Sequence, residues 1–457
     1  MLRTLFILAI LIPGFLAALR WRYAALLMYL WFALFRPQDW LWIDITTLRV
    51  PLVLGVVMLA PAIVSGVLPN VTHPLSIGMI LFLATSVAAQ VGAIQPAIGW
   101  VWIDFLVRLF IACLMLVTLA SESKRLFGVF SVIAVSLGFH AAKAGLAFLL
   151  GGGIRFADGL AGAFVDNNGY ALGTVMIIPL LVATAQNVEV IYTGRLVVWI
   201  RRGLYAAVPL CMFAVVGTYS RGGFVALAVA TLTFVLLQRR RLPALAGLTL
   251  ALTLFLLVVP IPKSYLDRLQ TIQTYNQIEE ESAQSRPHFW RVGLDMVAAH
   301  PMGIGLKQYE VAYDQYDFSH GRYGHHRAVH NSHVQVLAEL GYAGAAVWIG
   351  LFGYACFACL RVRARAADHP DPAVTRFLLT VSNALLTSIT SFVVGGAFLS
   401  LALNDLTWLT FGLVAALDRV SIQLCEAPAV VMVRAPIAVP LAFRAVDTFA
   451  IARKGQL

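Results

Sequence analysis

Long uninterrupted apolar runs recur along almost the whole chain and constrain its fold more than any other feature. A run of about 20 residues is long enough to cross a hydrocarbon core of about 30 Å as an α-helix. The composition agrees, because 60% of the 457 residues are hydrophobic, only 12% are charged and the mean hydropathy is +0.83. We therefore expect an all-α polytopic membrane protein with about twelve transmembrane helices. The runs lie near residues 4–19, 23–42, 50–69, 75–93, 98–120, 126–150, 169–186, 203–219, 222–238, 242–260, 333–360, 375–396 and 400–417.

The first run follows a lone arginine, Arg3, and could pass for a secretory signal peptide. No small-x-small cleavage site precedes a mature soluble sequence, and further apolar runs follow at once, so we expect residues 4–19 to form the first membrane helix. No internal repeat suggests the inverted halves of a transporter. The polar groups within the runs, such as Asp104, Arg108 and Lys143, are scattered and outline no path through the membrane, which disfavours a transporter or flippase.

Basic residues in the short loops predict the orientation, because Lys and Arg concentrate on the cytoplasmic side. If the runs alternate in direction, all the basic clusters fall on one side. The clusters are Arg20 with Arg22, SESKR at 121–125, Arg201 with Arg202, QRRR at 238–241, and RVRAR at 361–365. The net charge of +11 is then explained by topology in a lipid membrane, and no nucleic-acid partner is expected.

The same alternation divides the chain into four regions. Residues 1–260 are expected to form a transmembrane bundle, and residues 261–329 a large periplasmic loop. Residues 330–420 are expected to return to the membrane, and residues 421–457 to form a cytoplasmic tail.

The expected periplasmic loop contains apolar residues at helical spacing. Tyr265, Leu269 and Ile272 recur every three to four positions, which predicts at least one short amphipathic helix lying on the membrane surface. Arg286 falls between this helix and a second one within residues 293–306. We expect the segment to act as a lid whose closure brings Arg286 to the active site.

Seven of the ten histidines lie between positions 288 and 333. His326 and His330 are four residues apart, a spacing at which two histidines on one helix face can share a zinc ion. Neither acidic nor cysteine ligands are nearby in the sequence, so we expect no metal site. His288, His300 and His320 fit a solvated loop.

His330 stands apart because a membrane helix begins directly after it. Ser332 and Gln335 have the spacing of a capping box, which predicts that the helix starts at Ser332. The unpaired amide groups and the positive end of the helix dipole would then favour an anion near His330 and disfavour a protonated imidazole. A neutral imidazole is able to accept a proton at pH 7.

Helical phase places small residues on the same side as His330. At 100° per residue, Gly341, Gly344 and Trp348 fall close to the direction of position 330, whereas Glu339 falls on the opposite face. Small residues on one stripe predict a close approach by another helix.

These residues resemble a known signature. His330 and Asn331, followed after nine residues by Gly341 and after two more by Gly344, match the pattern H-[NSQ]-x9-G-x-x-[GTY] of the O-antigen ligases, and the position after a large periplasmic loop matches as well. The wider family also contains O-antigen polymerases and bacterial protein O-oligosaccharyltransferases. Its fold is similar to that of the lipid-dependent glycosyltransferases.

The resemblance implies a reaction. The enzyme would transfer a glycan from undecaprenyl pyrophosphate to an acceptor hydroxyl at the periplasmic face of the bacterial inner membrane, with inversion, and without metal, ATP or another cofactor. His330 would act as the general base. For a ligase the acceptor is the lipid A core oligosaccharide, whereas a protein or another glycan would be the acceptor for the protein glycosylation ligases and the polymerases.

The resemblance also implies arginines that hold the pyrophosphate. Ser220-Arg221-Gly222-Gly223 resembles the first arginine site, although Arg221 also fits an arginine that reaches lipid phosphates. The second site is Arg286 or Arg291. Trp290 stands where the family has a leucine four positions after Arg286, and Arg291 misses the spacing to Leu294 by one.

Further polar residues are expected on the outer face. They are possible substrate contacts, and loop capping is an alternative role for the first four. The residues are Arg155, Asp166, Asn167, Asn168 and His333.

Overall fold

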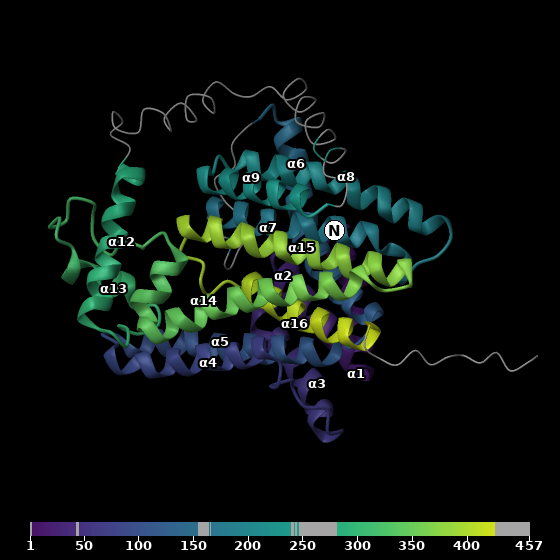
Figure 1. The fold of residues 1–457 in the computed structure, drawn as a ribbon, viewed down its shortest axis with the longest axis horizontal. Coiled ribbons are helices and arrows are strands. Elements are labelled where there is room, and N and C mark those ends of the chain that lie inside the picture. Colours follow the sequence, from purple (N-terminus) through teal and green to yellow (C-terminus); the bar gives the residue numbers. More distant parts are fainter. Residues whose placement is uncertain are drawn as a thin grey trace, which may run out of the picture.

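The computed structural model describes residues 2–42, 45–153, 164, 166–238, 242, 245 and 281–425, and every regular element within them is helical. Most of the long helices run side by side along the long axis of the molecule (Figure 1). The α-helices are α1 (Leu2–Arg20), α2 (Arg22–Phe35), α3 (Val50–Val64), α4 (Pro74–Ala88), α5 (Pro96–Leu119), α6 (Ser123–Leu150), α7 (Asn167–Gln186), α8 (Arg195–Gly217), α9 (Arg221–Leu236), α12 (Glu281–Ala299), α13 (Tyr309–Tyr316), α14 (Ser332–Ala367), α15 (Pro372–Gly395) and α16 (Asp405–Cys425).

The apolar runs become helices, which confirms the expected polytopic membrane protein. Within the described residues, nine helices are long and apolar enough to cross a membrane. Three shorter apolar helices, α2, α3 and α9, coincide with further predicted runs. Apart from residues 242 and 245, the run at residues 242–260 lies outside the described part of the chain, so the total of about twelve spans stays a prediction.

Aromatic packing joins α14 to its neighbours in the centre of the bundle. Trp348 of α14 lies 5.6 Å from Trp408 of α16, 5.8 Å from Phe82 of α4 and 6.1 Å from Phe392 of α15, measured between ring centroids. All four side chains are buried. These contacts hold the middle of α14 on three sides.

The basic clusters approach one another within the bundle. The Tyr23 hydroxyl donates to the Arg125 carbonyl at 2.7 Å, which joins two of the predicted basic loops. Glu189 accepts from Arg201 at 2.7 Å and from Arg376 at 2.9 Å. One prediction was wrong in detail, because Arg201 lies inside α8, which begins eight residues before the expected run.

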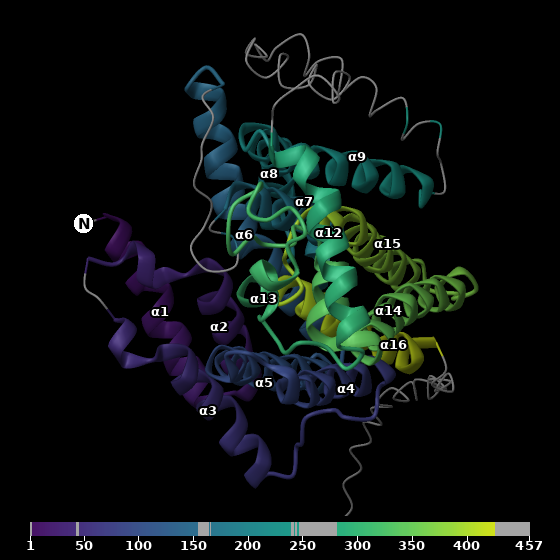
Figure 2. The ribbon, with the colours of Figure 1, turned by 90° about the vertical axis from the view of Figure 1, so that its left-hand side faces the viewer.

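The segment before α14 crosses one end of the bundle. α12 runs across the ends of the long helices, with α13 beside it (Figures 1 and 2). A small apolar core holds α12 and α13 onto the start of α14, and its members include Phe289, Met296, Tyr313 and Ala338.

One expectation for this segment changes, and another is not tested. Arg286 lies inside α12, not between two helices. The amphipathic helix expected around Tyr265, Leu269 and Ile272 lies outside the described residues.

Candidate active site

His330 lies directly before α14, in a backbone conformation that few non-glycine residues adopt. Its φ is 50°, and its backbone N–H donates to the Ser400 hydroxyl at 2.9 Å. The ring is half-buried and its centroid is 6.2 Å from that of Phe289 on α12. The segment between α15 and α16 thus fixes the backbone of His330, while α12 covers its ring.

The surroundings of His330 favour the neutral form of its imidazole. Burial lowers the pKa of His330, and the positive charges of Arg286 and Arg327 lower it further, whereas Asp166 opposes them. Desolvation disfavours the charged form of a base, and neighbouring cations act in the same direction. Burial, the largest cause, and the two neighbouring arginines thus favour the neutral form, which the helix end had been expected to favour.

The cap of α14 differs from the predicted one. The helix does begin at Ser332, but Asn331 caps it, because its side-chain oxygen accepts from His333 N at 2.9 Å and from Val334 N at 3.1 Å. Ser332 instead donates to the Leu399 carbonyl and accepts from Leu401 N. The predicted capping box was therefore wrong. The amides of His333 and Val334 already donate to Asn331, so they are not available to an anion.

Gly341 interrupts α14 instead of facing another helix. Its φ is 67° and its ψ is −168°, and an added Cβ would fall on the carbonyl oxygen of Pro301. The prediction of a helix–helix contact at a glycine stripe was wrong, because the phase does not continue across the break and the partner is a loop. Gly344 is buried, and an added Cβ there would meet Leu340 of the same helix.

The loop from Pro301 to Lys307 is paired with this break. Ile304 N donates to the Ala338 carbonyl at 3.1 Å, Gly305 N donates to the Glu339 carbonyl at 3.0 Å, and Tyr342 N donates to the Pro301 carbonyl at 3.1 Å. The buried Glu339 carboxylate also accepts from Lys307 N at 2.9 Å. Glu339 therefore orders a loop of the site, although it does not face His330.

Arg286 and Arg221 approach the site from two helices. The guanidinium carbon of Arg286 lies 5.7 Å from the centroid of the Phe398 ring. Arg221 begins α9, and its neighbour Gly222 packs on the same phenylalanine, because a Cβ on that glycine would be 3.2 Å from the Phe398 Cβ. Phe398 thus lies near both predicted pyrophosphate-binding residues, and Ser400, two residues on, holds His330.

Arg291 has a different environment. Its side chain is 67% exposed and forms an ion pair with Asp295 one turn along α12, with Nε and Oδ1 3.1 Å apart. Of the two candidates for the second arginine, the geometry favours Arg286.

The sequence reasoning missed Arg327. Its charge lowers the pKa of His330, and its guanidinium carbon lies 5.9 Å from the centroid of the Phe289 ring. Only its closeness to His330 in the chain could have suggested it.

It also missed the pair of Asp317 and His288. The solvated-loop reading of His288 was wrong, because its ring is buried and its Nε2 lies 2.8 Å from Asp317 Oδ1. Asp317 accepts further hydrogen bonds from Ser319 and Gly321, and these lower its pKa to about 2 in spite of burial. The spacing of Asp317 and Ser319, typical of an Asx turn, was the available signal. His300 and His320 are exposed, as expected.

The remaining candidates act mostly as structural residues. Asp166 caps α7 by accepting from Asn168 N and Gly169 N, and the Asn167 amide donates to the Thr218 carbonyl at 2.9 Å. Both nitrogens of His333 are engaged, since Trp348 Nε1 donates to its Nδ1 at 3.0 Å and its Nε2 lies 2.9 Å from the Val393 carbonyl. Arg155 lies outside the described residues.

The histidine pair considered for zinc does not share a helix. His326 and His330 both have left-handed φ values, and the His326 ring faces Asp314 and the Glu310 carbonyl. Among the residues that the structure describes, no three His, Cys, Asp or Glu side chains form a group that could hold a metal ion.

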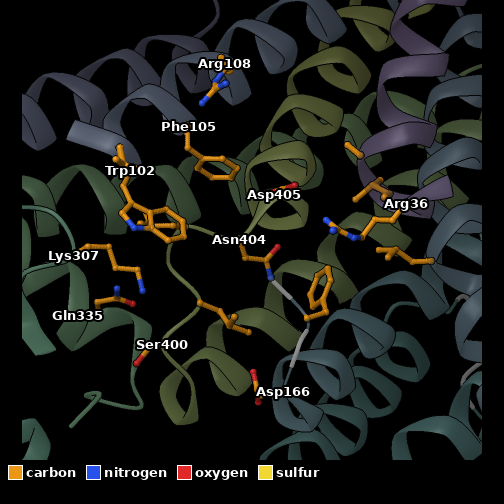
Figure 3. A pocket seen from close by; sticks show the side chains of 17 residues that line it. Arg36, Trp102, Phe105, Arg108, Asp166, Lys307, Gln335, Ser400, Asn404 and Asp405 are labelled. Carbon is orange, nitrogen blue, oxygen red and sulfur yellow. The ribbon is translucent and has the colours of Figure 1, made fainter. Parts of the chain in front are cut away.

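A cavity of about 650 Å³ opens beside this site (Figure 3). It lies among α2, α5, the start of α14 and the segment before α16. Ser400, the partner of the His330 backbone, and Asp166, whose charge acts on His330, both line it. The cavity thus adjoins the candidate base.

The fold and the site together define a multi-pass helical membrane protein with a histidine and arginine site at one end of its bundle. Residues 206–349 match the family model of the O-antigen ligases, which confirms the resemblance to that family over this segment. The matched segment contains Arg221, Arg286, His330, Gly341 and Gly344. No protein of the curated collection matches the chain. The family match supports a glycosyltransferase-like enzyme of the ligase or polymerase type, with a lipid-linked glycan and an acceptor as substrates.

Proposed function

We propose that this protein is an O-antigen ligase that transfers a glycan from undecaprenyl pyrophosphate to a hydroxyl of the lipid A core oligosaccharide. The reaction takes place at the periplasmic face of the bacterial inner membrane, and it needs no metal. The observation that carries the proposal is the half-buried His330, kept neutral by burial and by two arginines at the end of the bundle.

His330 accepts the proton of the acceptor hydroxyl. As the proton leaves, the hydroxyl oxygen attacks the anomeric carbon of the donor from the face opposite the pyrophosphate, so the configuration inverts. A base that is neutral at the working pH is suited to this role. The hydrogen bond from the His330 backbone to Ser400 and the ring contact with Phe289 keep the imidazole in one place.

Arg221 and Arg286 hold the leaving group. The bond between the anomeric carbon and the pyrophosphate oxygen breaks, and the electron pair stays on undecaprenyl pyrophosphate. Guanidinium groups bind phosphate oxygens in a bidentate manner and stabilise the charge that develops on them. Arg286 lies against Phe398, and Arg221 begins α9 beside Gly222, which packs on the same phenylalanine; this arrangement supports a diphosphate site on this side of His330.

The position of the basic loops supports the orientation. The expected cytoplasmic clusters around Arg22 and Arg125 belong to helix ends other than those that carry His330, Arg221 and Arg286. With the former ends in the cytoplasm, the site faces the periplasm.

The test is transfer by purified protein in nanodiscs, with an undecaprenyl-pyrophosphate-linked glycan as donor and lipid A core as acceptor. His330→Ala is expected to abolish transfer while thermal stability stays near wild type, because His330 precedes α14 and its ring is only half-buried. His300→Ala is the control, since His300 is an exposed histidine of the same segment. Transfer by His330→Ala at a rate near that of His300→Ala would refute the role of His330.

A further inference from the structure

The cavity beside His330 combines charges of both signs with aromatic walls. Arg36 and Lys307 contribute positive charge, Asp166 and Asp405 contribute negative charge, and Trp102 lines one side. Figure 3 shows Asn404 and Asp405 between Trp102 and Lys307 on one side and Arg36 on the other. A cavity of this kind, with apolar walls and a few placed polar groups, suits a polar neutral ligand better than a simple anion.

Two amide groups in this cavity have one hydrogen-bonding atom each that is buried and unpaired within the described structure. Asn404 is 1% exposed, and its oxygen accepts from Leu406 N at 2.7 Å, but its Nδ2 has no partner. Gln335 is 2% exposed, and its Nε2 donates to Glu339, but its Oε1 has no partner. A buried donor or acceptor without a partner costs roughly 1–3 kcal/mol, so these atoms point to a ligand that both donates and accepts.

An apolar groove continues from the cavity. A second cavity, of about 490 Å³, lies among α2, α3, α5 and α16, and its lining includes Leu52, Gly55 and Val56. It shares Arg36, Phe105, Arg108 and Asp405 with the first cavity. A ligand with hydroxyl groups at one end and hydrocarbon at the other would fill both.

We propose that these joined cavities bind the acceptor as a glycolipid, with its sugar hydroxyls on Asn404 and Gln335 and its acyl chains in the groove lined by Gly55. This inference rests on the proposed function and names the acceptor side of the same site. Arg286 lies against Phe398, Arg221 begins α9 next to Gly222, which packs on Phe398, and neither arginine lines these cavities. The donor pyrophosphate and the acceptor then reach His330 from different sides. A protein acceptor without acyl chains would leave the apolar groove unfilled.

The decisive experiment measures binding of lipid A core to purified protein in nanodiscs without any donor. Asn404→Ser keeps an oxygen that caps α16 and removes the amide donor, so we expect binding about three- to tenfold weaker, the effect of one neutral hydrogen bond. Gly55→Phe places a ring in the groove from a position where an added Cβ meets nothing within 4 Å. Displacing two methylene groups would weaken binding about fifteenfold.

Gly353→Phe is the matched control, because Gly353 is an exposed glycine of α14 with open space at its Cβ and lies outside both cavities. With the delipidated core oligosaccharide as ligand, Asn404→Ser should still weaken binding, whereas Gly55→Phe should have no effect.

Unchanged lipid A core binding in both Asn404→Ser and Gly55→Phe would overturn the proposal, as would transfer to a peptide hydroxyl that is faster than transfer to lipid A core. Because binding is measured without donor, it is independent of whether wild type transfers a glycan. A protein that binds lipid A core through these residues but does not transfer would contradict the proposed function alone.

Discussion

Replacing Asp317 by asparagine tests whether the segment that leads to His330 is held by a single buried carboxylate. Asp317 accepts from Ser319 N at 2.9 Å, Ser319 Oγ at 2.6 Å, Gly321 N at 2.7 Å and His288 Nε2 at 2.8 Å. Asparagine has the same shape but presents an NH₂ group to one of these donors and carries no charge. The segment should therefore open more often in the variant.

The pKa gives the size of the effect. The Asp317 pKa is lowered from 3.8 to about 2, although burial acts in the opposite direction, which corresponds to about 2.5 kcal/mol of preference for the ionised form. We expect the amides of Ser319 and Gly321 to exchange with deuterium about 60-fold faster in Asp317→Asn. Because the folded pKa is lowered, this stabilisation is present above the ordinary pKa and is lost as the pH falls through about 2, a dependence that the variant should lack.

The control is Asp314→Asn, because Asp314 pairs with two exposed histidines, His325 and His326. Exposed pairs contribute about 0–1 kcal/mol, so exchange should change by less than about fivefold. Transfer should fall in Asp317→Asn and stay near wild type in Asp314→Asn, since Arg327 and His330 follow Asp317 in the segment. Equal exchange at Ser319 and Gly321 in wild type and Asp317→Asn would refute the reasoning.

Three further predictions concern the site. Gly341→Ala should lower the free energy of unfolding by about 1–3 kcal/mol and reduce transfer, because the added methyl group would meet the Pro301 carbonyl at a residue with a left-handed φ. Gly353→Ala is the control, and an equal thermal midpoint in the two variants would contradict the role of the break in α14. Arg327→Gln should move the acid limb of the pH–rate profile to higher pH, because it removes a cation that lowers the pKa of His330 and activity requires the neutral ring; an unmoved limb would exclude an electrostatic role. Transfer should persist in EDTA, since the arginines neutralise the pyrophosphate, and activity that returned only with zinc or magnesium would show that a metal takes part.

The sequence predicted what depends on length and local pattern. Within the described residues, the apolar runs form helices, and α14 begins at Ser332 as expected. The break of α14 at Gly341 was not predictable from the sequence, because the left-handed φ of Gly341 depends on the loop that begins at Pro301. This loop packs against Gly341 through backbone contacts. Similarly, nothing local to His288 indicates a partner 29 residues away.

The choice between Arg286 and Arg291 also required the structure. Both lie on α12, and only their side-chain environments, near Phe398 or beside Asp295, separate them. The joined cavities were not predictable either, because their lining comes from helices distant in the sequence.

The short connection between α15 and α16 has a consequence for how this enzyme could be altered. Within residues 396–404, Phe398 lies against Arg286, Ser400 holds the His330 backbone, and Asn404 reaches into the cavity. If the proposed function holds, this one stretch of chain sets the distances between the leaving-group site, the base and the acceptor site. A single-residue deletion or insertion in residues 396–404 would shift all three sites at once. To engineer specificity for a new acceptor, the length of this connection should be kept and the cavity walls contributed by α2, α3 and α5 varied.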